Sequence, residues 1–412
     1  MLFLGIASII GSGGGGGGSS DTTTTTTLPD GSTTTTTTPT TIPTTSTTTT
    51  STSTTTTTPA GSTSTTTSTS SSTTSSTTTS TTSSTSTSTT TTTLPSQTPS
   101  LEGDWGTYTS GSVIYGLISF NASGTVTNGN WTEKYPENDN AWATSTGTFT
   151  GGQLSVDNFG SITGDITKSS GITNTVISGQ LCPISSVAAF TGDEDGASVI
   201  IKRAAAYTPA GLAGDWFYCT ANQHGVVQVD GNGNVTGGEW NAPGLNPDSG
   251  DITGGTLNFN SQGQISGTIS SDFPNLVTIV DSQLDEYKEV AAATGSDASG
   301  YANMLIVKSG TGFATSDLQG TWHLVTYHGS GQISSSTLAI DASGNVIVNS
   351  DYTGGSLAIT GDGSITGQVQ TPGLHTVSIT GQMNANNDFA ALHLLDTTAP
   401  EESAFAAAVL KD

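Results

Sequence analysis

The chain has 412 residues, of which 7 are Lys or Arg and 32 are Asp or Glu, so its formal net charge at pH 7 is -25. A surface of this sign repels nucleic acid and anionic lipid, which excludes both as expected partners, and it favours solubility and contact with cations or basic proteins. The two cysteines lack a Cys-x-x-Cys spacing, which excludes a disulfide-rich scaffold and predicts no zinc, haem or redox site.

Residues 1–12 form a short apolar run that ends in small residues. The run is typical of the core of a secretory signal and is too short to cross a bilayer as a helix. The basic start of such a signal is absent, and Ser12 stands where a bacterial lipoprotein would carry its lipid-bearing cysteine. We therefore expect an extracellular or outer-surface protein without a transmembrane segment, and lipid anchoring stays open.

Residues 13–100 are glycine and then almost only threonine and serine, interrupted by prolines. Hardly any apolar side chain is available to offset the entropy of ordering this backbone, so the segment is predicted to be a disordered, low-complexity stalk. Dense hydroxyl groups with proline are also typical of O-glycosylated stalks. A glycosylated stalk and a bare flexible linker are the two alternatives.

Beyond residue 100 the chain contains three copies of one sequence pattern. Each copy opens on Leu-x-Gly-x-Trp, which ends at Trp105, Trp216 and Trp322. The later shared elements are Gly-Gly-x-Leu segments from Gly151, Gly254 and Gly354 and the closing stretches ASVIIKR, ANMLIVKS and FAAAVLKD. Several elements in one order predict tandem duplication, with β modules at 101–208, 209–314 and 315–412.

The periodicity inside a module is that of β-strands. In the third copy, Leu357 and Ile359 alternate with polar residues before a Gly-Asp-Gly turn, and Ile365 and Val369 alternate after it, as in a hairpin. About eight short strands per module and no helix predict an all-β fold of antiparallel meanders. Small eight-stranded up-and-down barrels are the expected form because closure removes exposed edges, with an open sheet or a sandwich as the alternative.

A Gly-x-Trp on the first strand of an eight-stranded meander resembles the calycins, the group of lipocalins and avidin-like proteins. The resemblance covers residues 101 to 412 as three copies. It implies that each tryptophan closes one end of a barrel and that a basic residue at the last strand packs across the indole ring. The expected pairs are Trp105 with Lys202, Trp216 with Lys308 and Trp322 with Lys411. The alternative is an ordinary core tryptophan with each lysine in solvent.

The interior of such a barrel is just wide enough to be filled by side chains or to hold one small molecule. The apolar residues of the third module suffice to fill it, so we expect filled barrels rather than ligand cups. The glycines of the repeated Gly-x-Ile-[Ser/Thr]-Gly element share strand parity with apolar neighbours. They are therefore expected to point inward, bend the strand or make room for a ring: Gly164, Gly267 and Gly367.

No sequence feature indicates catalysis. The 5 histidines occupy no position shared by the three modules, and neither a nucleophile motif nor a phosphate-binding loop occurs. We therefore expect no enzyme, no cofactor and no metal site. The segment 192–196 gathers three carboxylates and could bind a divalent cation weakly, but a solvated loop is the expected explanation.

The cysteines Cys182 and Cys219 lie in consecutive modules. Strand alternation places both on outer barrel faces, so they could form an inter-module disulfide or remain two separate thiols. Neither alternative is favoured by the sequence.

These features together predict an exported or cell-surface, non-enzymatic protein that presents three β modules on a polar stalk. Its expected role is adhesion or interaction with a protein or glycan, including copies of itself, through surfaces that the sequence does not assign. The alternatives are small-ligand-binding barrels of the lipocalin or avidin kind, or a structural subunit of an extracellular filament or matrix.

Overall fold

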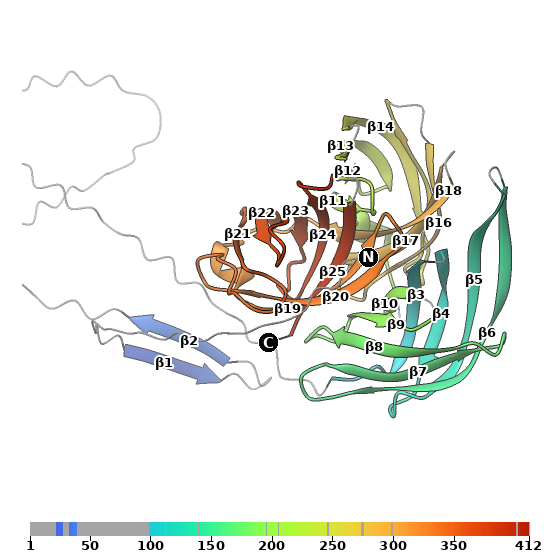
Figure 1. Cartoon of the computed structure of the whole chain (residues 1–412), viewed down its shortest axis with the longest axis horizontal. Helices are drawn as coiled ribbons and strands as arrows, with labels where there is room; N and C mark the ends of the chain where they lie inside the picture. Colours follow the sequence, from blue (N-terminus) through green and yellow to red (C-terminus); the bar gives the residue numbers. More distant parts are fainter. Residues whose placement is uncertain are drawn as a thin grey trace, which may run out of the picture. The chain divides into compact units, whose positions relative to one another are not determined.

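The computed structural model describes residues 22–27, 33–38 and 99–411, except 112, 139–140, 195, 205, 245–246, 273–275, 298–299 and 401–402. The predicted signal segment and most of the predicted stalk lie outside the described residues, as does Asp195 of the predicted cation-binding turn. Within the stalk, β1 (Thr22–Thr27) and β2 (Thr33–Thr38) pair as antiparallel strands. Both are runs of threonine, whose β-branched side chain favours extended backbone (Figure 1).

The first barrel is a closed meander of eight antiparallel strands, in which the last strand pairs with the first (Figure 1). The all-β fold and the closed barrel predicted from sequence are confirmed here. Its strands are β3 (Gly103–Gly111), β4 (Val113–Phe120), β5 (Val126–Asn138), β6 (Ala141–Val156), β7 (Ile162–Lys168), β8 (Thr173–Leu181), β9 (Val187–Gly192) and β10 (Gly196–Lys202).

The second barrel repeats this topology and is also closed, again by pairing of its last strand with its first. It follows a short 3-10 helix, η1 (Pro209–Leu212). Its strands are β11 (Gly214–Cys219), β12 (His224–Val229), β13 (Asn234–Ala242), β14 (Asp248–Phe259), β15 (Ile265–Ser271), β16 (Leu276–Leu284), β17 (Val290–Asp297) and β18 (Gly300–Lys308).

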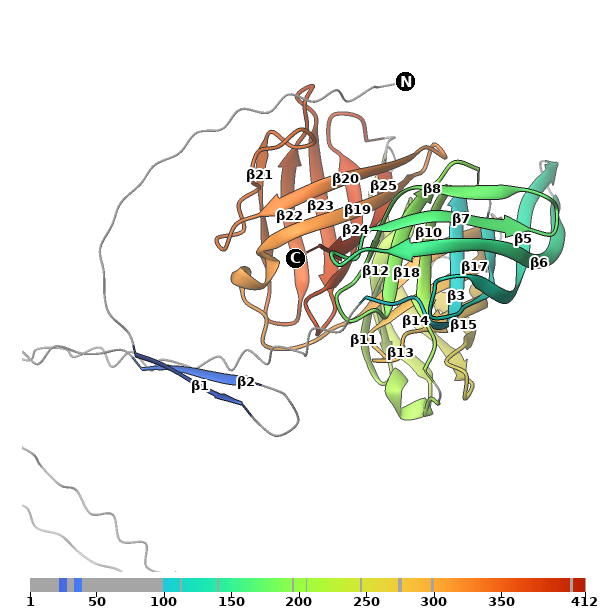
Figure 2. The same cartoon turned by 90° about the horizontal axis from the view of Figure 1, so that it is seen from below.

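The third module is an open sheet of seven strands in the order β20-β19-β25-β24-β23-β22-β21, so the closed eight-stranded barrel predicted for it does not form (Figure 2). It follows the 3-10 helix η2 (Thr315–Leu318). Its strands are β19 (Gly320–His328), β20 (Ile333–Ile340), β21 (Gly354–Ile359), β22 (Ser364–Gln370), β23 (Thr376–Met383), β24 (Phe389–Asp396) and β25 (Ser403–Leu410).

The missing strand of the third module is replaced by side-chain hydrogen bonds. Between β20 and β21 the backbone makes only isolated bridges, at Asn345 and Val346. Downstream, Asn349 Oδ1 accepts from the backbone N–H groups of Asp351 and Tyr352, and Asp351 Oδ2 accepts from Thr337 N–H. Asparagine and aspartate compete in this way with a strand ladder, so the chain turns where the other modules continue as a strand.

The Leu-x-Gly-x-Trp motif makes the same hydrogen bond in each module. The tryptophan Nε1–H donates to the carbonyl oxygen of the leucine four residues earlier. The distances are 2.7 Å for Trp105 to Leu101, 2.7 Å for Trp216 to Leu212 and 2.9 Å for Trp322 to Leu318. The intervening glycines have positive φ angles, for example 122° at Gly103 and 136° at Gly214, which L side chains rarely adopt. The leucine and the glycine of the motif are thus both needed to hold the tryptophan in its position.

The outer faces of strands from all three modules share one apolar core. It includes Ile201 of the first barrel, Phe217 and Val307 of the second, and Phe389 and Phe405 of the third module. Separate cores fill or line the interiors of the modules. Residues that alternate along a strand therefore serve two cores, one inside the module and one between modules.

Candidate functional site

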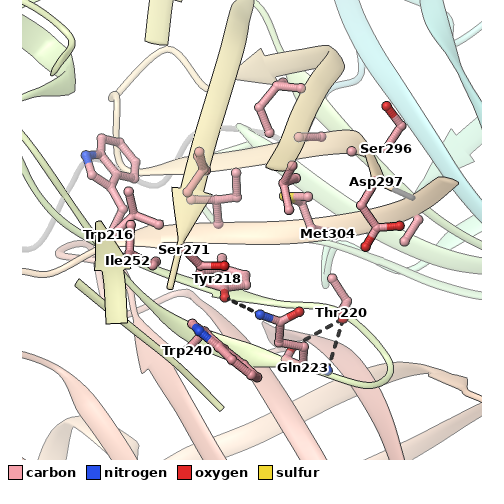
Figure 3. A pocket seen from close by; sticks show the side chains of 18 of the residues that line it. Trp216, Tyr218, Thr220, Gln223, Trp240, Ile252, Ser271, Ser296, Asp297 and Met304 are labelled. Carbon is pink, nitrogen blue, oxygen red and sulfur yellow. Dashed lines mark hydrogen bonds between the residues drawn. The ribbon is translucent and has the colours of Figure 1, made fainter. Parts of the chain in front are cut away.

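The second barrel encloses a cavity of about 390 Å³. Figure 3 shows Trp216 at one side of the cavity and Ser296 and Asp297 at the opposite side. The wall between them is mostly apolar and includes Ile252 and Met304. Our expectation that the barrels are filled is therefore wrong for this one.

The second barrel is hollow because smaller side chains occupy inward positions that are large in the first barrel. Phe190 is buried inside the first barrel, two residues after Ala188, the ladder partner of Leu181. At the same register in the second barrel, two residues after the partner of Leu284, stands Ala293. The strands of both barrels have the same spacing, so replacing the phenyl ring of Phe190 by the methyl group of Ala293 leaves empty volume inside the second barrel.

A second difference between the barrels is the side chain next to a tryptophan that occurs at equivalent positions in both. In the first barrel Lys168 is only 5% exposed, and its Nζ lies 5.3 Å from the centroid of the Trp131 ring. The register of β14 and β15 places Trp240 at the position of Trp131 and Ser271 at the position of Lys168. The space taken by the lysine stem in the first barrel is thus part of the cavity in the second.

Polar groups gather near the open end of the cavity. Gln223 Nε2 donates to Tyr218 Oη at 2.8 Å, and Trp240 Nε1 donates to Asp272 Oδ1 at 3.1 Å. The Tyr218 hydroxyl, which accepts from Gln223, is protonated at neutral pH and can donate into the cavity; burial raises its pKa further above the ordinary value. The labelled side chains of Tyr218, Gln223 and Trp240 lie together in Figure 3.

The basic residues of the second barrel lie away from the open end of its cavity. Asp248 and Asp297 line the cavity, and no lysine or arginine is among the described residues that line it. The module's two basic residues, Lys288 and Lys308, both lie against Gly211 at the end closed by the tryptophan. One lysine of the first barrel lies nearby: Lys134 Nζ is 5.0 Å from the ring centroid of Tyr301, which lines the cavity.

The structure brings together two of the three expected tryptophan–lysine pairs. Lys202 Nζ lies 5.9 Å from the Trp105 ring centroid and Lys308 Nζ lies 5.4 Å from that of Trp216.

In the third module the residue opposite Trp322 is Leu410, and Lys411 lies one position beyond it, where its N–H donates to the carbonyl oxygen of Thr321. The third expected pair is therefore wrong by one residue: Leu410, and not Lys411, occupies the position that Lys202 and Lys308 hold in the other modules.

The glycines Gly164, Gly267 and Gly367 have a different role from the one expected. A Cβ at any of them would collide with a backbone carbonyl oxygen of the facing strand, those of Gln153, Thr256 and Ser356 respectively. They therefore permit close approach of two strands rather than making room for the tryptophan ring.

Both cysteines are free and buried. Cys182 Sγ accepts from the backbone N–H groups of Ser186 and Val187, and Cys219 Sγ lies 3.7 Å from the carbonyl oxygen of Leu392. Burial raises the pKa of both thiols far above the usual range. Of the two alternatives that the sequence left open, the structure has two separate thiols, both in the core between modules.

Sequence reasoning missed a buried carboxylate at the position equivalent to Cys182. Asp285 Oδ1 accepts from Glu289 N–H at 2.8 Å and from Val290 N–H at 3.0 Å, while its Oδ2 has no hydrogen-bond partner among the described residues. Burial raises the pKa of Asp285 to about 6. Aligning the turns that follow Leu181, Leu284 and Met383 would have identified this position.

No group of three or more His, Cys, Asp or Glu side chains that could hold a metal ion occurs in the described part of the chain. In the predicted acidic turn, Asp193 Oδ1 instead accepts from Thr175 N–H at 2.6 Å. Among the described residues, no helix is both long and apolar enough to cross a membrane.

No family model matches the chain, and no curated protein matches it. A structure of transferrin binding protein B from Neisseria meningitidis serogroup B is similar at 12% identity and a TM-score of 0.25, covering 73% of this chain and 65% of that one. A double mutant of transferrin binding protein B from Haemophilus parasuis Hp5 is similar at 10% identity and a TM-score of 0.25, covering 75% and 76%. A single mutant of the Haemophilus protein gives 10% identity, a TM-score of 0.24 and coverage of 72% and 65%. The likeness is too loose to assign a family.

Proposed function

We propose that the second barrel binds one small, mainly apolar ligand in its interior, and that the chain is a binding protein and not an enzyme. The observation that carries this proposal is the cavity of about 390 Å³. Small-molecule sites commonly have volumes of about 300 to 1,000 Å³ and apolar walls with a few polar groups. This is also the function that the calycin resemblance implies.

The walls supply both affinity and orientation. Trp216, Ile252 and Met304 offer apolar surface, and burying a ligand against it yields roughly 25 cal/mol per Å² removed from water. The Tyr218–Gln223 pair supplies hydrogen-bonding groups that fix the ligand's polar end. Trp216 lies at the opposite end, so the ligand enters from the side of Asp297.

The test is titration of the full chain with N-phenyl-1-naphthylamine, an uncharged apolar dye whose fluorescence rises in a dry site. We expect saturable binding with one dye per chain. Ala293→Phe places the phenyl ring of the first barrel in the cavity and should abolish binding, whereas the control Val280→Phe places a phenyl ring at an exposed position. Ala293→Leu, which copies Leu392 of the third module, serves if the phenylalanine variant does not fold. Unchanged dye binding by a folded, filled variant would refute the proposal.

A second candidate function is contact with another protein or a second copy through the third module. Its sheet has two edges, β20 and β21, and the connection between these strands exposes Ile347 (51%) and Val348 (65%). A third large apolar side chain, Leu374 (92%), is exposed in the turn between β22 and β23. Exposed strand edges and apolar side chains favour association. Sedimentation of the full chain over a concentration series, compared with Val348→Lys, tests self-association and filament assembly together.

Export to the extracellular space or outer cell surface belongs to this second candidate, as does presentation on a stalk, with or without sugars. Fractionation of the producing cells, with the mass of the recovered protein, tests location and glycosylation. Recovery only from the cell interior would contradict it.

A further inference from the structure

The first barrel carries its own ammonium group at the place where the second barrel is hollow. Lys168 extends into the first barrel beside Trp131, with its Nζ 5.3 Å from the ring centroid. An ammonium group over an indole face is stabilised by the negative electrostatic potential of the ring, most strongly when both are shielded from water. The first barrel therefore shows that this interior accepts a cation next to its tryptophan.

The second barrel keeps the tryptophan and loses the cation. Trp240 pairs with Gly250 as Trp131 pairs with Gly147, and Ser271 pairs with Ile252 as Lys168 pairs with Phe149. A serine hydroxyl neither reaches over the ring nor carries charge. The indole of Trp240 thus lines the cavity where the equivalent ring in the first barrel faces a lysine.

The charge next to this site is also reversed. Asp272 follows Ser271, at the position that Ser169 holds in the first barrel, and its Oδ1 accepts from Trp240 Nε1. Asp248 lines the cavity where the first barrel has Ser145, and Asp297 lines it from β17. A lysine and two serines of the first barrel therefore correspond to Ser271 and Asp248, which line the cavity, and to Asp272 beside Trp240, while Glu133 of the first barrel corresponds to Ala242.

From this exchange we infer that the ligand of the second barrel is an organic cation, an ammonium group attached to a small apolar body. The inference rests on the proposed ligand-binding function and adds the ligand's charge to it. The apolar body occupies the interior toward Trp216, and the ammonium group lies by the Trp240 ring, near Asp248 and Asp272. A carboxylate of the same size is repelled by these aspartates.

The test compares three probes with one apolar chain and different heads: n-octylammonium, n-octanol and n-octanoate. Each is titrated into the full chain by displacement of N-phenyl-1-naphthylamine, at low and at physiological salt. We expect octylammonium to bind about tenfold more tightly than octanol or better, octanoate to bind weakest, and added salt to reduce the difference.

Variants locate the effect in the barrel. Ser271→Lys copies the first barrel and should reverse the order, so that octanoate binds more tightly than octylammonium. Asp272→Ser and Asp248→Ser, which also copy the first barrel, should each reduce the preference for octylammonium several-fold. As a control, Glu239→Gln removes one negative charge from the exposed residue that precedes Trp240, and it should leave the preference for octylammonium unchanged.

The outcomes separate this inference from the function on which it rests. Equal binding of the three probes would overturn the ammonium inference and leave ligand binding in place. A preference for octylammonium that survives all three barrel variants would also overturn it, because the cation would then bind elsewhere on the acidic surface. Failure of every probe, including the dye, would remove both.

Discussion

Replacing Asp285 with asparagine should raise the free energy of unfolding at neutral pH, although it removes a residue that is fully buried and hydrogen-bonded. The third module shows that an asparagine side chain can accept the same two backbone hydrogen bonds. Asn384 follows Met383 as Asp285 follows Leu284, and its Oδ1 accepts from the N–H groups of Asp388 and Phe389. The substitution therefore keeps both backbone hydrogen bonds, removes the charge and replaces Oδ2, which has no hydrogen-bond partner among the described residues, by an amide NH2 group.

The magnitude follows from the pKa of the buried carboxyl. Burial, and to a lesser extent the charge of Asp388, raises the pKa of Asp285 from 3.8 to about 6, against the lowering effect of its backbone hydrogen bonds. A shift of about two units corresponds to about 3 kcal/mol, at about 1.4 kcal/mol per unit, as an upper limit for the gain.

The sign depends on pH. Because the folded-state pKa is raised, the protonated group stabilises the fold fully below 3.8, and this stability is lost as pH rises through about 6. The variant should match the wild type at the acidic end of this window and exceed it at the neutral end.

Urea unfolding followed by tryptophan fluorescence, repeated across this pH window, measures the difference. Glu286→Gln removes the same charge from the next residue and is the matched control. An equal gain at both ends of the window would refute the reasoning, as would an asparagine variant that is less stable than the wild type at neutral pH.

Two further substitutions test local features of the fold. Leu374 is 92% exposed with a φ of 68°, so Leu374→Gly should stabilise the chain by about 0.5 to 1 kcal/mol, seen as a higher Tm by scanning calorimetry; a lower Tm would contradict this. Lys308→Met removes the contacts of the ammonium group with the Trp216 ring and with the carbonyl oxygen of Gly211, so it should lower the free energy of unfolding by about 1 kcal/mol. Lys411→Met should change the Tm little, because Leu410 and not Lys411 faces Trp322. Equal losses in the two variants would argue against the observed register.

Much of the fold could be predicted from sequence because its determinants are local. Alternation of apolar and polar residues indicates strands wherever it occurs, and Asp-Gly and Asn-Gly turns end them, so the all-β meanders followed from short stretches such as residues 354 to 370. The repeated Leu-x-Gly-x-Trp marked the start of each copy. It did not reveal that the leucine contributes its carbonyl oxygen, because a backbone hydrogen bond leaves no trace in residue type.

The candidate site could not be predicted, because a cavity is a sum over strands that are far apart in sequence. Each inward residue of the second barrel is ordinary by itself; the space arises because Ala293 and Ser271 are small at positions where Phe190 and Lys168 are large. The register that makes these residues equivalent is set by the ladder hydrogen bonds.

The sequence by itself determined most of the strands, their turns and the position of the tryptophan that begins each module, because each depends on neighbours within a few residues. Only the tertiary structure decided that two sheets close and the third stays open, that Leu410 and not Lys411 faces Trp322, and that one barrel is hollow. Closure, register and free volume depend on how strands distant in sequence pair and on the summed volume of the side chains between them, and no local pattern encodes either quantity.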